Sequence, residues 1–193
     1  EIILATKKLD KKQTDRPSVK KYFENEISIM KELNHPNIVK FYDMLASYSH
    51  YYVVMEYCNG GGLSDCLKKY KKLYNKPFTQ EIVQYLMRQI IDGLKYLHSR
   101  KIIHRDIKLD NILVTFANEK DKNSLNMLAS QVKIIDFGLA TRLGPEDLTY
   151  TALGSPINMD PLILKKYSKA GGSEKLQGYN EKADIWSLGT ICY

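Results

Sequence analysis

The sequence has 193 residues, of which 44% are hydrophobic and 26% are charged. This composition is typical of a folded globular protein with a sizeable core, and it excludes a disordered chain. No apolar run approaches the roughly 20 residues that cross a bilayer, and no signal-peptide pattern is present. The three cysteines, Cys58, Cys66 and Cys192, include no C-x-x-C pair, which argues against a disulfide framework and a zinc site. We therefore expect a cytoplasmic protein without a transmembrane segment.

The net charge of +7 would suit a nucleic acid or an anionic lipid surface as a partner. The basic residues, however, are spread along the chain in short groups such as Lys7-Lys8, Lys11-Lys12 and Lys165-Lys166, and aromatic residues do not alternate with them. This pattern favours solvated helix faces and loops. It predicts no nucleic-acid partner and leaves peripheral recruitment to a membrane open.

An apolar strand over residues 2–5 opens the chain without a cap or linker before it, so the first residues are expected to lie within a sheet. Alternation along the strand places Lys7 on the same face as Ile3, Ala5 and Leu9. An amine on an apolar face that includes a small residue suits the approach of a ligand. The alternative is that this lysine and the next are merely solvated at the end of a strand.

Residues 18–33 predict a helix that begins after Pro17 and has one buried stripe. The apolar residues of the stripe recur at helical spacing: Val19, Phe23, Ile27, Met30 and Leu33. Glu26 lies at the edge of this stripe, where an unpaired charge is costly and a cation is needed. Glu24 and Glu32 fall off the stripe and are expected to be solvated.

Two strands are predicted at residues 41–46 and 51–57, on either side of a polar turn. Glycines at 60–62 follow, and the composition then changes from strand-forming to helix-forming. This change predicts a boundary between two parts of the molecule. Beyond it, a helix is expected over 63–74 and a longer one after Pro77-Phe78-Thr79, whose buried face comprises Ile82, Leu86, Ile90, Leu94 and Leu97.

A short strand at 101–103 leads to the densest group of reactive side chains in the sequence, His104-Arg105-Asp106-Ile107-Lys108-Leu109-Asp110-Asn111. Packing alone does not explain this density, although a polar loop that caps its own backbone is the alternative. A strand at 112–114, an aperiodic polar stretch at 116–131 and a strand at 132–135 follow. The last strand runs into Asp136-Phe137-Gly138.

The segment from His104 to Asn111 resembles the H-R-D-x-K-x-x-N catalytic loop of eukaryotic protein kinases, and Asp136-Phe137-Gly138 resembles their D-F-G motif. Lys7, Glu26 and Asp184 appear in the order and spacing that the family shows. Lys108 is typical of the serine/threonine class. Three features are most similar to the autophagy-initiating, ULK-type kinases. They are the amino-acid sequence of residues 54–61, the insertion between 113 and 132, and Gly154-Ser155-Pro156 with Met159.

The resemblance implies an α+β, bilobal kinase fold. Residues 1–58 would form part of the small lobe, and residues 59–193 would form the hinge and part of the larger lobe. It also implies that a hairpin with the glycine-rich loop precedes the sequence and that further helices follow it. The sequence by itself is therefore expected to be inactive as a fragment.

The same resemblance implies transfer of the ATP γ-phosphoryl group to serine or threonine hydroxyls of protein substrates, with ATP and Mg²⁺ required and regulatory subunits left open. The catalytic residues would be Asp106 as the base, Lys108 as a charge stabiliser and Asn111 as a metal ligand. Asp136 would be the second metal ligand. The nucleotide would be held by Ala5, Lys7, Glu26, Met55, Glu56, Cys58, Leu113 and Asp136.

Four further roles are implied by the resemblance. Phe137 would pack under His104, Asp184 would brace the backbone of the catalytic loop, and Ser155 would lie near Asp106 and Lys108. Arg105 would bind a phosphate added to the threonine-rich segment after Gly138. Thr149, Tyr150 and Thr151 are the acceptors there, and Thr151 is favoured over the alternative of an unmodified loop.

The sequence departs from the family at Asp160-Pro161-Leu162, where relatives have A-P-E. The replacement removes the glutamate that anchors the end of the activation segment in relatives. It is the basis for an alternative in which the fold is a pseudokinase that binds nucleotide or serves as a regulatory scaffold. A kinase of small molecules is a third option, disfavoured by the long threonine-bearing segment after Asp136.

Overall fold

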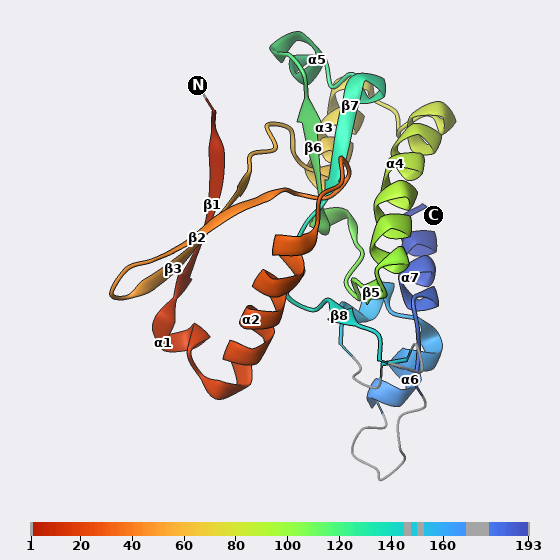
Figure 1. Cartoon of the computed structure of the whole chain (residues 1–193). Helices are drawn as coiled ribbons and strands as arrows, with labels where there is room; N and C mark the ends of the chain where they lie inside the picture. The colour runs from red at the N-terminus through yellow and green to blue at the C-terminus, as the bar shows by residue number, and fades with distance from the viewer. Residues whose placement is uncertain (1, 145–147, 150–152, 169–177, 193) are drawn as a thin grey trace.

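The computed structural model describes residues 2–144, 148–149, 153–168 and 178–192. Helices and strands are both present, as the expected α+β class requires (Figure 1). The elements gather around two hydrophobic clusters, a small one in the N-terminal sheet and a large one among the helices that follow.

The N-terminal sheet is antiparallel and consists of β1 (Leu4–Asp10), β2 (Phe41–Ala46) and β3 (His50–Glu56), in the order β1-β3-β2. Exposure alternates along β1, and Ala5, Lys7 and Leu9 occupy its less exposed face, as predicted. A four-residue helix, α1 (Lys11–Thr14), connects β1 to α2 (Pro17–Glu32). Helix α2 lies across the sheet, so the strand face that carries Lys7 meets a helix (Figure 1).

Helix α2 contributes to both clusters, and this divides its buried face. Phe23 and Ile27 pack with Val53 of the sheet, whereas Ile29 and Met30 join the large cluster. The predicted stripe is wrong at its first position, because Val19 is 43% exposed. Val19 belongs to neither hydrophobic cluster, and helical spacing alone does not show where the partner surface ends.

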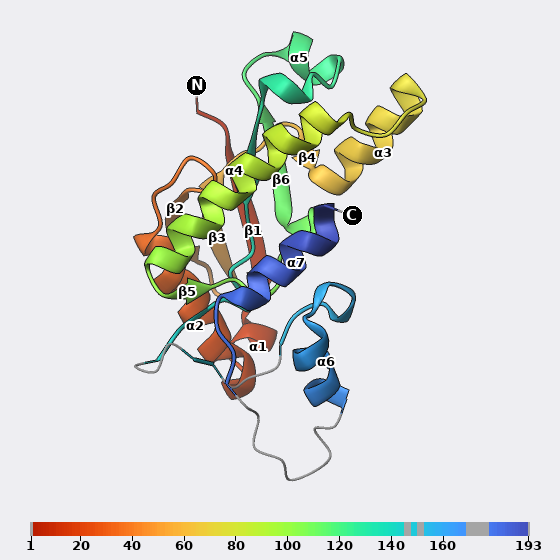
Figure 2. The ribbon, with the colours of Figure 1, turned by 90° about the vertical axis from the view of Figure 1, so that its right-hand side faces the viewer.

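The large cluster is built mainly on α3 (Leu63–Tyr74), α4 (Gln80–Ser99) and the sheet β4-β6-β7. The strands of this sheet are β4 (Gly61–Gly62), β6 (Ile112–Phe116) and β7 (Ser130–Ile134). Thr79 caps α4 by accepting from the Ile82 amide, and the predicted face from Ile82 to Leu97 is buried. Helix α7 (Lys182–Cys192) lies beside α4 (Figures 1 and 2).

The remaining elements are short and surround the reactive loop. Strand β5 (Ile102–Ile103) pairs with β8 (Thr141–Arg142), and the 3₁₀ turns are η1 (Leu109–Asn111), η2 (Met127–Ala129) and η3 (Pro156–Asn158). Helix α6 (Pro161–Ser168) precedes α7. Among the residues that the structure describes, no helix combines the length and apolar character that a membrane span requires.

The polar stretch at 116–131, expected to lack regular structure, contains helix α5 (Glu119–Asn123) and η2. Asn118 caps α5 by accepting from the Asp121 amide at 2.9 Å. The stretch is fastened to the core because Met127 is buried and Tyr85 of α4 donates to the Ser130 carbonyl. A five-residue helix is too short to produce a periodic pattern, so the prediction failed here for lack of signal.

Candidate active site

Lys7 lies between two carboxylates that come from distant parts of the chain. Its Nζ is 2.8 Å from Oε1 of Glu26 on α2 and 3.6 Å from Oδ1 of Asp136. Burial lowers the pKa of Lys7, but the charges and hydrogen bonds of Glu26 and Asp136 outweigh it and raise the pKa above its ordinary value. The amine is therefore held in its charged form. Glu26 was expected to need a cation, and that cation is Lys7.

Helix α2 is also fastened to the segment that follows Asp136. The side-chain amide of Asn25 donates to the Ala140 carbonyl at 2.8 Å, and Arg142 pairs with Glu32 at 2.7 Å. Glu32 is exposed, as expected, but the sequence did not indicate this partner. These two contacts hold one side of α2 against the segment that follows Asp136. The apolar face of α2 packs against the N-terminal sheet.

The carboxylate of Asp106 is the centre of a second group. Lys108 donates to its Oδ2 at 2.6 Å, and Asn111 donates to Oδ2 and to the Asp106 carbonyl, both at 2.8 Å. The Ser155 amide donates to Oδ1 at 3.0 Å, and the Ser155 hydroxyl donates to the same oxygen. Lys108 also donates to the Ser155 hydroxyl at 2.9 Å. A hydroxyl oxygen thus lies between a carboxylate and an ammonium group.

Asp106 remains ionised because of these donors. Burial raises the pKa of Asp106, but the hydrogen bonds from Lys108, Ser155 and Asn111, with the charge of Lys108, lower it below its ordinary value. The carboxylate is therefore a weak base that accepts hydrogen bonds well. Such a group orients a hydroxyl first and takes its proton only when the hydroxyl has become more acidic.

The pKa of Asp106 leads to a testable pH dependence. Replacing Lys108 with methionine removes donors that lower this pKa, so the pKa should rise and the carboxylate should become protonated at higher pH. We expect the acidic limb of log(kcat/KM) against pH to move to higher pH, in addition to a loss of rate. Lys95→Met, at an exposed lysine of α4, should leave the limb in place. An acidic limb that stays fixed or moves to lower pH in Lys108→Met would contradict the assignment.

The two groups are joined through the backbone that connects them. The Ile135 amide donates to the Asn111 carbonyl at 3.0 Å, and Nε2 of His104 lies 2.9 Å from the Ile135 carbonyl. The Asp106 amide donates to Nδ1 of His104 at 3.3 Å. This pair of bonds fits a neutral His104 with its proton on Nε2. Ile135, the residue just before Asp136, is therefore hydrogen-bonded to both ends of the loop that carries Asp106.

Packing and buried hydrogen bonds support this arrangement. Phe137 is fully buried, and its ring lies 5.2 Å from that of His104, as expected. Asp184 on α7 has no exposed surface and accepts from the amides of His104 at 2.9 Å and Arg105 at 2.8 Å. His98 of α4 contributes a third contact to the same carboxylate at 2.8 Å. The expected brace of the catalytic loop is present.

Two residues of this site have a left-handed backbone conformation. Arg105 has a φ of 69° and Asp136 a φ of 64°, values that non-glycine residues rarely adopt. Such conformations persist when the surroundings enforce them, and they are common at functional sites. Gly154 has a φ of 129°, and a Cβ built there would lie 2.3 Å from the Arg105 carbonyl oxygen. Only glycine allows Ser155 to approach Asp106 this closely.

The residues expected to contact adenine lie on adjacent elements. Ala5 and Met55 are paired in the register of β1 and β3. Cys58 is buried, and burial raises the pKa of its thiol. Leu113 is half-buried on β6, where it pairs with Gly62.

Sequence reasoning missed the ion pair of Lys133 and the helix-capping role of Asp160. Lys133 of β7 is buried and pairs with Glu56 at 2.8 Å, so the Glu56 side chain is engaged within the protein. Nothing in the sequence around Lys133 indicated this contact. Asp160 caps α6 by accepting from the Leu162 amide at 2.7 Å. An aspartate before a proline at the first turn is a helix-start signal, so this role could have been predicted.

Asp136 and Asn111 are the residues of this site expected to hold Mg²⁺. Within the described residues, no group of three or more His, Cys, Asp or Glu side chains could hold a metal ion unaided. Mg²⁺ commonly binds one or two protein oxygens together with substrate phosphates. Asp136 offers a half-exposed carboxylate. Asn111 directs its amide nitrogen to Asp106, which turns its amide oxygen away from Asp106. These donors fit the ion.

The acceptors of the threonine-rich segment are described only in part. Tyr150 and the favoured Thr151 lie outside the described residues. Thr149 is buried and exchanges two backbone hydrogen bonds with Tyr179, at 2.8 and 2.9 Å. Arg105 is buried, and its Nε donates to the Leu139 carbonyl at 2.6 Å. Arg105, the residue expected to bind a phosphate, therefore lies next to the threonine-rich segment that carries these acceptors.

Comparison with known proteins agrees with this geometry. The family described as "Protein kinase domain" matches residues 1–193. The chain is 39% identical over 168 residues to human serine/threonine-protein kinase ULK1, a match that covers 87% of this chain and 14% of that protein. It is 34% identical over 190 residues to Arabidopsis thaliana ATG1a (98% and 26%) and 32% identical over 193 residues to the probable kinase fhkD of Dictyostelium discoideum (99% and 24%).

These relatives are named as serine/threonine-protein kinases, and the chain spans about a quarter or less of the length of each. The whole-length match to the family and the geometry of the two bonded groups lead to the same assignment. The chain belongs to the protein kinase family.

Proposed function

We propose that the protein transfers the γ-phosphoryl group of ATP to serine or threonine hydroxyls of protein substrates, with residues 1–58 and 59–193 belonging to the two lobes. The observation that carries this proposal is the placement of a charged lysine between Glu26 and Asp136, in a site whose backbone is bonded to the loop of Asp106. The amine and the acidic group needed for phosphoryl transfer are thereby supplied by one connected site.

The nucleotide would be bound by the face of β1 that carries Ala5 and Lys7. Lys7 would contact the α and β phosphates, and Glu26 would keep its amine from moving away. Met55 and the backbone from Glu56 to Cys58 would contact the adenine, with Leu113 on its other side. Mg²⁺ held by Asp136 and Asn111 would neutralise negative charge on the phosphates.

The acceptor hydroxyl would be oriented by Asp106. In the transfer, the hydroxyl oxygen forms a bond to the γ phosphorus, the bond from that phosphorus to the β–γ bridging oxygen breaks, and ADP leaves with the bond electrons. Asp106 accepts the proton of the hydroxyl. Lys108 stabilises charge that moves onto the phosphoryl oxygens. The contacts that Ser155 makes with Asp106 and Lys108 support this role, because a substrate hydroxyl needs the same two partners.

The similarity to ULK1 and ATG1a supports a finer assignment to the kinases that initiate autophagy. The insertion between β6 and β7 and the Gly154-Ser155-Pro156 sequence suit that group. A cytoplasmic location accords with the presence of three free cysteines.

A radiolabelled phosphate-transfer assay with full-length protein and a serine-containing protein substrate tests the proposal. Lys7→Met should lower kcat/KM by roughly 10²- to 10³-fold, the range for removal of one preorganised electrostatic donor. Lys8→Met is the matched control, since Lys8 is exposed on the opposite face of β1, and it should retain activity within about threefold.

Two results would contradict the proposal. Unchanged turnover in Lys7→Met would show that the lysine has been misassigned. An absence of transfer by the wild type despite tight nucleotide binding would favour a scaffold of the pseudokinase type.

A further inference from the structure

Helix α3 carries a concentration of positive charge that the site does not use. Residues 63–78 contain five lysines and one aspartate, a net charge of +4 out of +7 for the whole chain. Its buried face, formed by Leu63, Cys66 and Tyr70, packs on the core. The lysines are exposed: Lys68, Lys69, Lys71, Lys72 and Lys76. Helix α3 and the residues directly after it are therefore one of the basic stretches of the chain.

Within the described residues, most of these lysines have no ion-pair partner. Lys68 has a loose, exposed pair with Asp65 at 3.6 Å. Within the described part of the chain, no carboxylate lies in ion-pair distance of Lys69, Lys71, Lys72 or Lys76. Like charges three and four positions apart on a helix destabilise it. Lys71 and Lys72 lie in the last turn of α3, where positive charge is favourable, but the lysines still repel one another and a ligand of opposite charge would relieve this repulsion.

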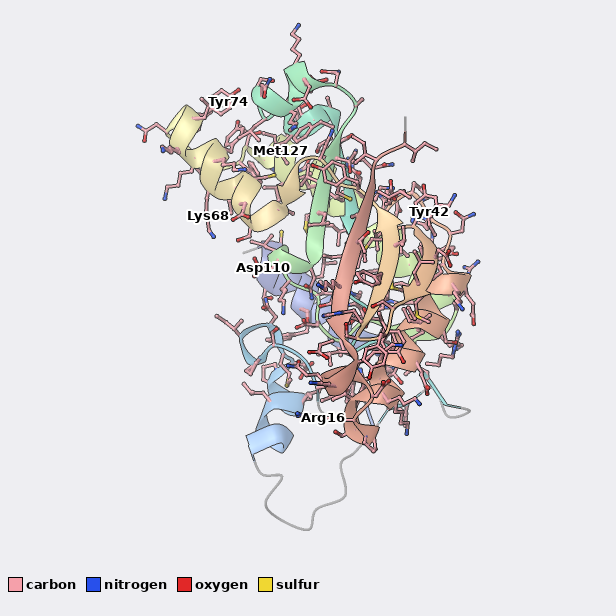
Figure 3. The ribbon with its side chains drawn as sticks, turned by 90° about the vertical axis from the view of Figure 1, so that its left-hand side faces the viewer. Arg16, Tyr42, Lys68, Tyr74, Asp110 and Met127 are labelled. Carbon is pink, nitrogen blue, oxygen red and sulfur yellow. The ribbon has the colours of Figure 1, made fainter. Side chains whose placement is uncertain are left out.

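Apolar side chains are exposed among the lysines. Leu73 is 56% exposed and Tyr74 is 42% exposed. Figure 3 shows Lys68 and Tyr74 on α3, at the opposite end of the molecule from Arg16. Lysines mixed with exposed leucine and tyrosine are typical of a helix that lies on an anionic membrane, where the stems and rings reach the interface.

Contacts with neighbouring residues hold the end of α3 in place. The Tyr74 hydroxyl donates to the Ser124 carbonyl at 2.6 Å, next to α5, and the Tyr70 ring packs against Tyr74 at 4.6 Å and Phe78 at 4.9 Å. Asn75 ends the helix in a left-handed conformation, with a φ of 52°. Helix α3 projects from the side of the molecule, far from α1 and α2 (Figure 2). A flat surface could therefore contact α3 without covering the end of the molecule that carries α1 and α2.

We propose that the exposed surface of α3 and of the residues directly after it, defined by Lys68, Lys69, Lys71, Lys72, Leu73 and Lys76, docks the protein on membranes that contain anionic lipids. The composition favours a lipid surface over a discrete phosphate group. The stretch has no arginine, whereas recognition of single phosphates or carboxylates benefits from the planar fork of arginine. Flexible lysines suit the continuous, laterally mobile charge of a bilayer.

Vesicle co-sedimentation with the full-length protein tests the proposal. The wild type should bind vesicles of phosphatidylcholine with about 30% phosphatidylserine and not pure phosphatidylcholine, and about 0.5 M salt should release it. Lys69→Ala/Lys72→Ala should weaken the partition coefficient about 30-fold, from the usual contribution of a lysine near an anionic surface. Transfer of phosphate to a soluble peptide should not change, since neither lysine touches the site.

The matched control is Lys12→Ala/Lys21→Ala, which removes two exposed lysines from the α1 and α2 end. It should change the partition coefficient by less than about threefold. Equal binding to both lipid mixtures would overturn the proposal, and so would equal losses in the two double variants, because binding would then follow net charge. A Lys69→Ala/Lys72→Ala variant that still binds vesicles but loses binding to polyglutamate would overturn it in favour of an acidic protein partner.

Discussion

Replacing Asp106 with asparagine is expected to lower kcat by roughly 10²- to 10⁴-fold, the usual contribution of general acid–base catalysis. Asparagine keeps an oxygen that can accept from Lys108 or Ser155, so the loop should retain its conformation. It cannot accept a proton from the substrate hydroxyl. The effect should therefore fall on kcat, while the affinity for ATP changes by less than about threefold.

Steady-state phosphate transfer and nucleotide titration measure the two quantities separately. Asp110→Asn is the matched control, because Asp110 is exposed in the same loop. It should retain kcat within about threefold. If Asp106→Asn also remained within that range, Asp106 would not be the residue that handles the proton.

Replacing Asp184 with alanine is expected to destabilise the protein by about 3–5 kcal/mol, since buried backbone and side-chain donors would lose a charged acceptor. Asp184 has no exposed surface and receives three contacts, from the amides of His104 and Arg105 and from His98. Loss of the carboxylate would leave the catalytic loop without its brace. Activity should fall at temperatures where the variant is still folded.

Chemical denaturation followed by circular dichroism gives the free energy of unfolding for this test. Glu181→Ala is the control at the start of the same helical region, where the backbone bond from the Asp184 amide to the Glu181 carbonyl stays intact. It should change stability by less than about 0.5 kcal/mol. A change of similar size in Asp184→Ala would mean that the carboxylate does not hold the loop.

The sequence predicted most of what depends on local pattern. Glu26 was expected to need a cation because it lies at the edge of an apolar stripe, whereas its pairing with Lys7 was implied by the family resemblance. The helix at 63–74 was expected from a change to helix-forming composition, and the buried face of α4 follows from spacing that repeats over several turns. The arrangement around Asp106 was expected from family resemblance, since residue spacing alone leaves open which side chains in a polar loop meet.

The features that were missed depend on contacts between distant segments or on signals too short to repeat. Lys133 gives no sign in the sequence that it would be buried against Glu56, because that pair forms only when β7 passes beside the end of β3. Val19 fits the helical period, but it is exposed and belongs to neither hydrophobic cluster. The cap role of Asp160 was available in the sequence and was obscured by comparison with a family motif.

The central claim is that Asp106 and Asp136 act on one nucleotide whose charge is neutralised by Lys7 and a divalent cation. Calorimetric titration of ATP with and without Mg²⁺ tests it most directly, in the wild type, Asp136→Asn and the control Asp110→Asn. Mg²⁺ should tighten ATP binding at least about tenfold in the wild type and in Asp110→Asn, and should have little effect in Asp136→Asn. An equal Mg²⁺ effect in all three proteins would contradict the account.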